Sequence, residues 1–309
     1  MIIIFLLLSL LVISLAVTGI IYRIAFYHPL SKRVQPSQVA QNSSYTPDIV
    51  ARMQEVMGEM ETIPYEEVSI RSEDGYELFG RYYEIDPKQP LEIFFHGYHG
   101  TFQWDGYGCF RYCRSHRHNL LLVEERAHGR SRSNTITFGI KERYDCLAWT
   151  DYAVKRLGES VDIILSGVSM GAATVLMASE LPLPSNVKAV IADCGYTSPV
   201  EIIKYMAADM HIPSGIGIFF AKLAAKLFGG FDLEEGSAVT AVRRTDIPVL
   251  FIHGDQDKVV PFAMCKELYE ACASQKKQIV IPKSGHAVNA MTDYDLYERE
   301  VEDFLKENL

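Results

Sequence analysis

The chain has 309 residues, of which 48% are hydrophobic and 22% are charged, the balance of a folded globular protein with one large core. Thirty basic residues stand against thirty-nine acidic ones, which gives a net charge of −9 at pH 7. The sequence contains no stripe of lysine and arginine of the kind that follows a phosphate backbone. Nucleic acid is therefore not an expected partner.

The first segment of the chain, Ile2 to Ile21, is uncharged and mostly apolar. A helix needs about 20 such residues to cross roughly 30 Å of hydrocarbon. We therefore predict a single-pass anchor in the cell membrane over residues 1–22. A cleaved signal peptide is the alternative, with Ser14 and Ala16 as a small-residue cleavage site, but it is disfavoured because no basic side chain precedes the run.

The charges that follow this segment predict its orientation. Arg23, Lys32 and Arg33 all come after the apolar run, and an excess of positive charge marks the cytoplasmic side of a membrane. We expect the body of the protein to be cytoplasmic. The six cysteines are scattered through a chain large enough to form its own core, so we expect free thiols rather than disulfides.

Residues 23–65 have the composition of a polar connector that contains one short amphipathic helix. Its apolar residues at helical spacing are Ile49, Met53, Val56, Met57 and Met60. We interpret this stripe as a packing face rather than a ligand site.

Residues 66–309 have the pattern of one α/β domain. The period-2 runs EEVSI and YELFGRYYE predict an opening hairpin. Strand-like runs then alternate with helical segments; these runs are LEIFF, NLLLVE, VDIILSG, AVIAD, PVLFIHG and QIVIP. The alternation predicts a mostly parallel sheet flanked by helices, whose chemistry gathers at the carboxyl ends of the strands.

One of these strand ends carries a candidate nucleophile. In ILSGVSMGAA, Ser169 lies between Gly167 and Gly171, at the turn from a strand into a helix. The two glycines remove side chains that would collide in so sharp a turn, and the serine hydroxyl is lifted out of the sheet. The pattern G-x-S-x-G in this context predicts that Ser169 is a nucleophile.

At this point the chain resembles the α/β-hydrolase superfamily, over about residues 66–309. FFHGYHG looks like the oxyanion loop of that superfamily, ERAHGRS like its R-G-H-G-x-S turn, and IHGDQDKVVP and SGHA like its acid and histidine loops. Two departures lie in the supporting turn: Ala127 replaces the usual glycine, and Glu124 or Glu125 stands where aspartate is common. The resemblance implies the α/β-hydrolase fold with a helical cap.

A serine nucleophile needs a histidine base that is itself oriented by a carboxylate, and in this fold the order along the chain is Ser, acid, His. His286 is the one histidine after the acid loop, and we predict that it is the base. The family spacing H-G-x-x-D-x-x-V-P favours Asp257 as the acid over Asp255, which we expect to bond loop amides. Asp193 also ends a strand and is a third candidate, with the more plausible role of fixing its own loop.

The developing oxyanion needs two backbone N–H donors. We predict that they come from Met170, directly after the nucleophile, and from Tyr98, directly after the His-Gly pair of the oxyanion loop.

We expect neither a metal nor a cofactor. His96 and His99 have no accompanying carboxylate at ligand spacing, and we expect them to shape their loop. Cys109, Cys113 and His116 share one face of a helix and could in composition hold zinc, but cysteines on such a stripe usually pack as small apolar side chains.

About fifty residues, 197–246, separate two consecutive strand-like runs, more than a strand connection needs. The resemblance implies a helical cap over the site. Its clearest element is residues 215–230, an apolar helix with Lys222 and Lys226 on one face. It is either an ordinary cap helix or a membrane-contacting one whose rings face an acyl chain.

The sequence thus predicts a membrane-anchored serine hydrolase that cleaves a carboxylic ester or thioester through an acyl-enzyme. The expected partner is a small or lipid-like acyl substrate. A peptidase or amidase of the same fold, and a non-catalytic binding module on a hydrolase scaffold, are the alternatives.

Overall fold

The computed structural model describes residues 1–33 and 44–309. The described residues form one eight-stranded sheet. Its strands are β1 (Glu66–Arg71), β2 (Glu77–Tyr83), β3 (Leu91–Phe95), β4 (Asn119–Glu124), β5 (Ile163–Val168), β6 (Val187–Asp193), β7 (Val249–Gly254) and β8 (Lys276–Ile281).

The spatial order of the strands is β1-β2-β4-β3-β5-β6-β7-β8. β2 pairs antiparallel with β1 and with β4, and every other pair is parallel. The predicted hairpin and the predicted mostly parallel sheet are both confirmed. The carboxyl ends of β3, β5, β7 and β8 therefore meet at one edge.

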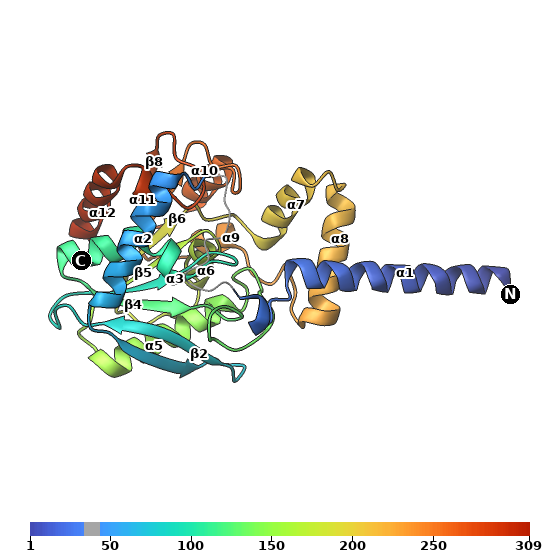
Figure 1. Ribbon diagram of the computed structural model, residues 1–309, viewed down its shortest axis with the longest axis horizontal. Helices are drawn as coiled ribbons and strands as arrows, with labels where there is room; N and C mark the ends of the chain where they lie inside the picture. Colours follow the sequence, from blue (N-terminus) through green and yellow to red (C-terminus); the bar gives the residue numbers. More distant parts are fainter. Residues whose placement is uncertain (34–43) are drawn as a thin grey trace.

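Two layers of helices cover the sheet (Figure 1). One layer contains α5 (Glu142–Leu157), α6 (Met170–Ala178), α9 (Ala238–Val242) and α10 (Phe262–Ala271). The other contains α2 (Pro47–Thr62), α3 (Phe102–Asp105), α4 (Tyr107–His116), α11 (Asn289–Thr292) and α12 (Tyr294–Asn308). A further short 3-10 turn, η1, spans Leu30–Lys32.

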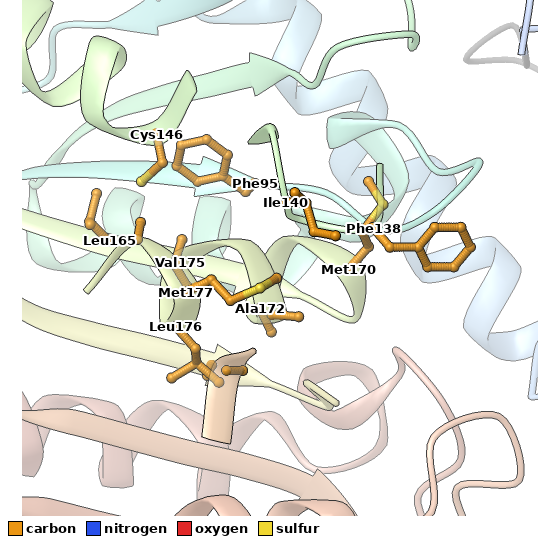
Figure 2. Close-up of a cluster of buried hydrophobic side chains, with 14 of the residues drawn as sticks. Phe95, Phe138, Ile140, Cys146, Leu165, Met170, Ala172, Val175, Leu176 and Met177 are labelled. Carbon is orange, nitrogen blue, oxygen red and sulfur yellow. The ribbon is translucent and has the colours of Figure 1, made fainter. Parts of the chain in front are cut away.

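Helix α6 is the central helix of its layer. Its nine residues are all buried, and Figure 2 shows Met170, Ala172, Val175, Leu176 and Met177 gathered beside Leu165 of β5. A helix that is apolar on every side must be enclosed by its neighbours. The residue before it, Ser169, is thereby fixed to a rigid support.

Helix α2 lies in the segment for which the sequence analysis expects a connector with one short amphipathic helix. Thr46 caps it by accepting a hydrogen bond from the backbone of Ile49, and Pro47 stands in its first turn. The side chains of Ile49, Met53, Val56 and Met60 are buried.

Helix α1 (Ile2–Ala25) extends away from the sheet (Figure 1). Its mean hydropathy reaches 2.8, and 6% of its most apolar window is buried. Within the described ranges it is the one helix long and apolar enough to cross a membrane. Length and composition fit an anchor and a signal sequence equally.

The residues between β6 and β7 form α7 (Pro199–Asp209), α8 (Ser214–Ala224) and a π-helical turn, η2 (Ala225–Gly229), before α9. Figure 1 shows α8 crossing the C-terminal part of α1. Phe219 is 59% exposed, so its ring points outward rather than toward the sheet. Periodicity predicted the helix but not which way its apolar residues face.

Candidate active site

Ser169 occupies a strained turn between β5 and α6. Its φ of 55° and ψ of −112° lie outside the regions that side chains favour. A Cβ on Gly167 would lie 2.4 Å from the backbone of Gly171, and a Cβ on Gly171 would lie 2.0 Å from the carbonyl oxygen of Phe95. Both glycines are sterically required, as the sequence predicted.

Ser169, His286 and Asp257 form one hydrogen-bonded chain. Nε2 of His286 lies 2.9 Å from Oγ of Ser169, and Nδ1 of His286 lies 2.7 Å from Oδ2 of Asp257. The three residues come from the loops after β5, β8 and β7. Topology alone brings them together, because these parallel strands end at the same edge of the sheet.

The carboxyl of Asp257 is held by four contacts. Oδ1 accepts hydrogen bonds from the backbone amides of Val259 and Val260, while Oδ2 faces both His286 and, at 3.4 Å, His253. Burial opposes ionisation of Asp257, but the hydrogen bonds with His253 and His286 outweigh it and hold its pKa below the usual range. Asp257 is therefore a fixed carboxylate that orients His286.

His253 is a site residue that the sequence did not single out. It lies at the end of β7, fully buried, and Nε2 is 2.9 Å from the carbonyl oxygen of Val260. Burial lowers its pKa, but Asp257 and Cys265 overcome this and raise it to about 10. The sequence does carry a signal for it, because His253 is the histidine of the H-G-x-x-D spacing that ends at Asp257.

The two other acid candidates lie elsewhere. Oδ1 of Asp255 accepts a hydrogen bond of 2.6 Å from the backbone amide of Lys283. Asp193 accepts one from the side chain of Asn289, and its own carbonyl accepts the amide of Ser169 at 2.8 Å. Burial raises the pKa of Asp193 to about 6. Asp255 and Asp193 thus each hold a loop, as the sequence analysis expected.

The loop after β3 lies directly against the serine. A Cβ on Gly97 would be 3.4 Å from Cβ of Ser169, so the backbone of Gly97 lies against Ser169, and Gly97, Tyr98 and Ser169 line one cavity. The amide of Gly97 donates a 2.7 Å hydrogen bond to Oδ2 of Asp105, which is half-buried. Asp105 on α3 was missed by the sequence analysis, and its role is to fix the course of this loop.

The loop is also tied to the end of α1. The hydroxyl of Tyr98 donates to the carbonyl of Ala25 at 3.0 Å. The rings of His28 and His99 are tilted against each other with centroids 4.3 Å apart, and the backbone amide of His99 donates to Nε2 of His128 at 3.0 Å. His99 therefore shapes the loop, as the sequence predicted.

A cavity of about 360 Å³ opens beside Ser169. The described residues that line it are largely apolar or aromatic. They include Tyr98, Phe138, Val168, Tyr196, Ile202, Met206, Val259 and Val260. Asp105 is the one carboxylate among the lining residues of the described chain, and it is engaged with Gly97. The cavity fits an uncharged group.

The supporting turn shows why glycine is usual at position 127. Ala127 has a φ of 60°, a left-handed conformation that favours glycine. Its carbonyl accepts a hydrogen bond from Nδ1 of His28 at 2.8 Å. Of the two acidic neighbours, Glu124 binds the side chain of Arg130, whereas Glu125 is fully buried, and burial raises its pKa well above the usual range.

Two groups of side chains in the described chain have ligand atoms close enough for a metal. Cys194 with Asp257 and His286 overlaps the hydrogen-bonded chain at Ser169. Glu92, Cys113 and His118 form the other, and there the thiol of Cys113 already donates to Glu92 at 3.2 Å. Burial raises the pKa of both the Cys113 thiol and the Glu92 carboxyl, which disfavours the charged forms that a metal would need as ligands.

The sequence profile of the prolyl oligopeptidase family matches residues 133–309, which is 177 of the 309 residues and covers Ser169, Asp257 and His286. The chain belongs to the prolyl oligopeptidase family. Membership places it in the α/β-hydrolase superfamily, which the sequence resemblance predicted. Family and fold together support a serine hydrolase of the α/β-hydrolase type.

Two curated relatives of this family member are similar over part of their length. The protein YqkD of Bacillus subtilis is 28% identical over 188 residues, which cover 60% of this chain and 62% of YqkD. The protein bem46 of Schizosaccharomyces pombe is 24% identical over 192 residues, which cover 62% of this chain and 58% of bem46. The chain thus spans about three fifths of these relatives.

Solved structures show the same fold. The esterase Pf2001 of Pyrococcus furiosus superimposes with a TM-score of 0.67 at 22% identity, covering 90% of this chain and 98% of that one. Est1E of Butyrivibrio proteoclasticus, with ferulic acid bound, gives 0.61 at 22% identity, covering 78% and 98%. Sequence identity at this level shows the fold alone.

Proposed function

We propose that this protein is a carboxylesterase in which Ser169, His286 and Asp257 act as a catalytic triad. The observation that carries the proposal is the chain of two hydrogen bonds, 2.9 Å and 2.7 Å long, that joins the three side chains beside an apolar cavity. A serine hydroxyl becomes a useful nucleophile at neutral pH only when a base takes its proton as it attacks.

In the first half of the reaction, Oγ of Ser169 attacks the ester carbonyl while its proton passes to Nε2 of His286. Nδ1–H of His286 remains bonded to Asp257, which stabilises the imidazolium that forms. The backbone amides of Tyr98 and Met170 stabilise the tetrahedral oxyanion. The leaving alcohol takes the proton from His286, and the acyl group stays on Ser169.

In the second half, water enters the vacated position. His286 takes one proton from the water as its oxygen attacks the acyl carbonyl. The second tetrahedral intermediate uses the same two amides, and its collapse returns the proton to Oγ of Ser169 and releases the acid. The reactants of the two halves are therefore the ester and one water molecule, and all other groups come from this chain.

Labelling with a fluorophosphonate tests the nucleophile. The full chain is expected to form a covalent adduct at Ser169, and Ser169→Ala is expected to form none. Because Ser169→Ala removes one side-chain oxygen and changes no residue of the sheet, its circular dichroism should match that of the unchanged protein. Absence of labelling in the folded, unchanged protein would instead support a binding module without catalysis.

The family membership favours a second candidate, cleavage of an amide bond by the same triad. A panel of p-nitrophenyl esters and aminoacyl p-nitroanilides separates the two reactions. The apolar lining of the cavity supports the ester, because a free amino terminus would need a carboxylate partner, and Asp105 is already engaged. Esters should therefore have the higher kcat/KM.

We further propose that α1 anchors the protein in the cell membrane with its body on the cytoplasmic side. Arg23 lies in the last turn of α1, Lys32 and Arg33 follow the helix, and Phe26, directly after α1, is packed into the body and is 1% exposed. Protease added outside intact cells should leave the body uncut. A mature chain beginning near Val17 would identify α1 as a signal peptide.

A further inference from the structure

The exposed part of α1 is shorter than the hydrocarbon layer of a membrane is thick. From Ile2 to Leu15 the helix is mainly exposed, and at 1.5 Å per residue this stretch measures about 21 Å. The apolar layer of a bilayer is roughly 30 Å thick. The next turns of α1, from Ala16 to Ile21, must therefore also lie at the depth of the hydrocarbon.

Those next turns are the ones that pack against the cap. Thr18 of α1 is completely buried, α1 packs mainly against α8, and the rings of Tyr22 and Phe228 are 5.7 Å apart. Because Thr18 lies within the stretch that the bilayer must cover, α8 reaches the same depth. Figure 1 shows α8 crossing α1 rather than lying beyond its end.

The outer side of α8 and η2 carries large apolar side chains, which are compatible with the hydrocarbon layer. Ile216 and Phe219 of α8 are three residues apart and are 56% and 59% exposed, and Leu227 and Phe228 of η2 are 54% and 47% exposed. We call these four residues the outer apolar face. A soluble surface rarely gathers side chains of this size, and their continuity with α1 indicates a single apolar environment for both.

The outer apolar face is connected to the cavity through α7. A Cβ on Gly217 of α8 would lie 3.0 Å from Cβ of Ala207 of α7, so the two helices pack closely. On α7, Ile202 and Met206 line the cavity, and Met206 is also 38% exposed. An apolar path thus leads from the surface that adjoins α8 to the hydroxyl of Ser169.

We propose that the outer apolar face lies in the hydrocarbon layer of a bilayer and that the cavity takes its substrate, an ester with a long acyl chain, directly from that bilayer. The proposal rests on the esterase function proposed above. Lys222 pairs with Glu234 at 2.7 Å, and Lys226 is exposed. Both lysine stems are long enough to carry their charge up to the headgroups.

Tryptophan fluorescence in vesicles tests the position of the face. The full chain is reconstituted in phosphatidylcholine brominated on its acyl chains, which quenches only rings within the hydrocarbon. The native Trp104 and Trp149 are 4% and 1% exposed and supply a constant background. Phe219→Trp should be strongly quenched. The control Tyr76→Trp, on the exposed turn between β1 and β2, should not. Equal quenching of the two variants would overturn the proposal.

A second measurement tests the delivery of substrate. Turnover of a long-chain p-nitrophenyl ester dissolved in vesicles is compared with turnover of p-nitrophenyl acetate in solution. The double variant Phe219→Ser, Leu227→Ser replaces two residues that are not among the described residues lining the cavity. It should leave acetate turnover unchanged, while turnover of the vesicle ester falls at least about tenfold. Equal turnover of the vesicle ester by both proteins would overturn the delivery route.

Fluorophosphonate labelling of the same preparations separates the two proposals. If Ser169 is labelled but Phe219→Trp is not quenched, the esterase proposal stands and the membrane face is refuted. If Phe219→Trp is quenched but Ser169 is not labelled, the face is supported and the esterase proposal is refuted, together with the delivery of an ester.

Discussion

The hydroxyl of Tyr98 donates a 3.0 Å hydrogen bond to the carbonyl oxygen of Ala25, the last residue of α1. Tyr98 belongs to the loop whose backbone borders Ser169, and its ring also stacks on Phe138 at 5.1 Å. The helix that we propose as a membrane anchor is therefore bonded to the loop that we propose as the oxyanion donor. A helix added merely as a tether would need no such contact.

The first prediction follows from this bond. Tyr98→Phe keeps the stacked ring and removes the hydroxyl, which releases the loop from α1. A neutral hydrogen bond contributes about 0.5–1.5 kcal/mol, so kcat/KM should fall about two- to tenfold. Tyr22→Phe is the control, since it removes another bond between α1 and the body, to Thr135. If both variants lose activity equally, the bond from Tyr98 has no particular effect on the loop.

The second prediction compares the two aspartates of the acid loop. Asp257→Asn keeps an oxygen for the amides of Val259 and Val260 but removes the charge that orients His286. Its kcat should fall about 10³- to 10⁴-fold with little loss of stability. Asp255→Asn should stay within about threefold of the unchanged protein, because the side chain of Asp255 accepts the amide of Lys283 and an asparagine keeps an oxygen for it. The reverse order would assign the acid to Asp255.

Ser169 and His286 could be predicted because each follows from a local pattern, a strand end and the residues beside it. The contact between Tyr98 and Ala25 could not, since it joins positions 73 residues apart. Asp105 lies on a helix of four residues, too short to leave a periodic signal. The direction of Phe219 was missed for a different reason: periodicity identifies an apolar face but not which neighbour, protein or membrane, covers it.

The third prediction concerns Asp105, whose pKa burial raises from 3.8 to about 6. A folded carboxyl with a raised pKa holds its proton longer than the unfolded one does. The free energy of unfolding of the unchanged protein should therefore fall as the pH rises from about 4 to about 6, relative to that of Asp105→Asn. Urea unfolding at several pH values measures this difference, and parallel curves for the two proteins would contradict it.

The same residue gives a matched test of the loop. Asp105→Asn retains an oxygen for the amide of Gly97, whereas Asp105→Ala leaves that buried amide without a partner, which costs about 1–3 kcal/mol. Above pH 6 we expect kcat to stay within about threefold for Asp105→Asn and to fall about 10- to 100-fold for Asp105→Ala. Similar losses in both variants would mean that the charge, and not the hydrogen bond, holds the loop.

The fourth prediction uses two glycines. Gly171→Ala places a Cβ 2.0 Å from the carbonyl oxygen of Phe95, so α6 or β3 must move, and we expect a loss of about 3 kcal/mol of stability together with activity. Gly58 lies on the exposed side of α2 with no atom within 4 Å of the added Cβ. Gly58→Ala should stabilise the protein by about 0.5–1 kcal/mol. Thermal unfolding followed by circular dichroism measures both.

The last prediction concerns the length of the acyl chain that the cavity accepts. Burying one methylene group gains about 0.8 kcal/mol, so kcat/KM for p-nitrophenyl esters should rise up to about fourfold per carbon from acetate until the cavity is filled. Ile202, which is 3% exposed, forms part of the cavity wall on α7. Ile202→Trp occupies part of the 360 Å³ and should move the optimum to a shorter chain while acetate is still cleaved.

Met206 provides the matched variant for this test because it lines the same cavity where the cavity meets the surface. Met206→Ala widens the opening without filling the interior, so it should leave the optimal chain length unchanged or longer. The opposite shifts of Ile202→Trp and Met206→Ala distinguish a cavity that holds the acyl chain from one that holds the alcohol. If neither substitution moves the optimum, the acyl group lies elsewhere, and the cavity accommodates the leaving group.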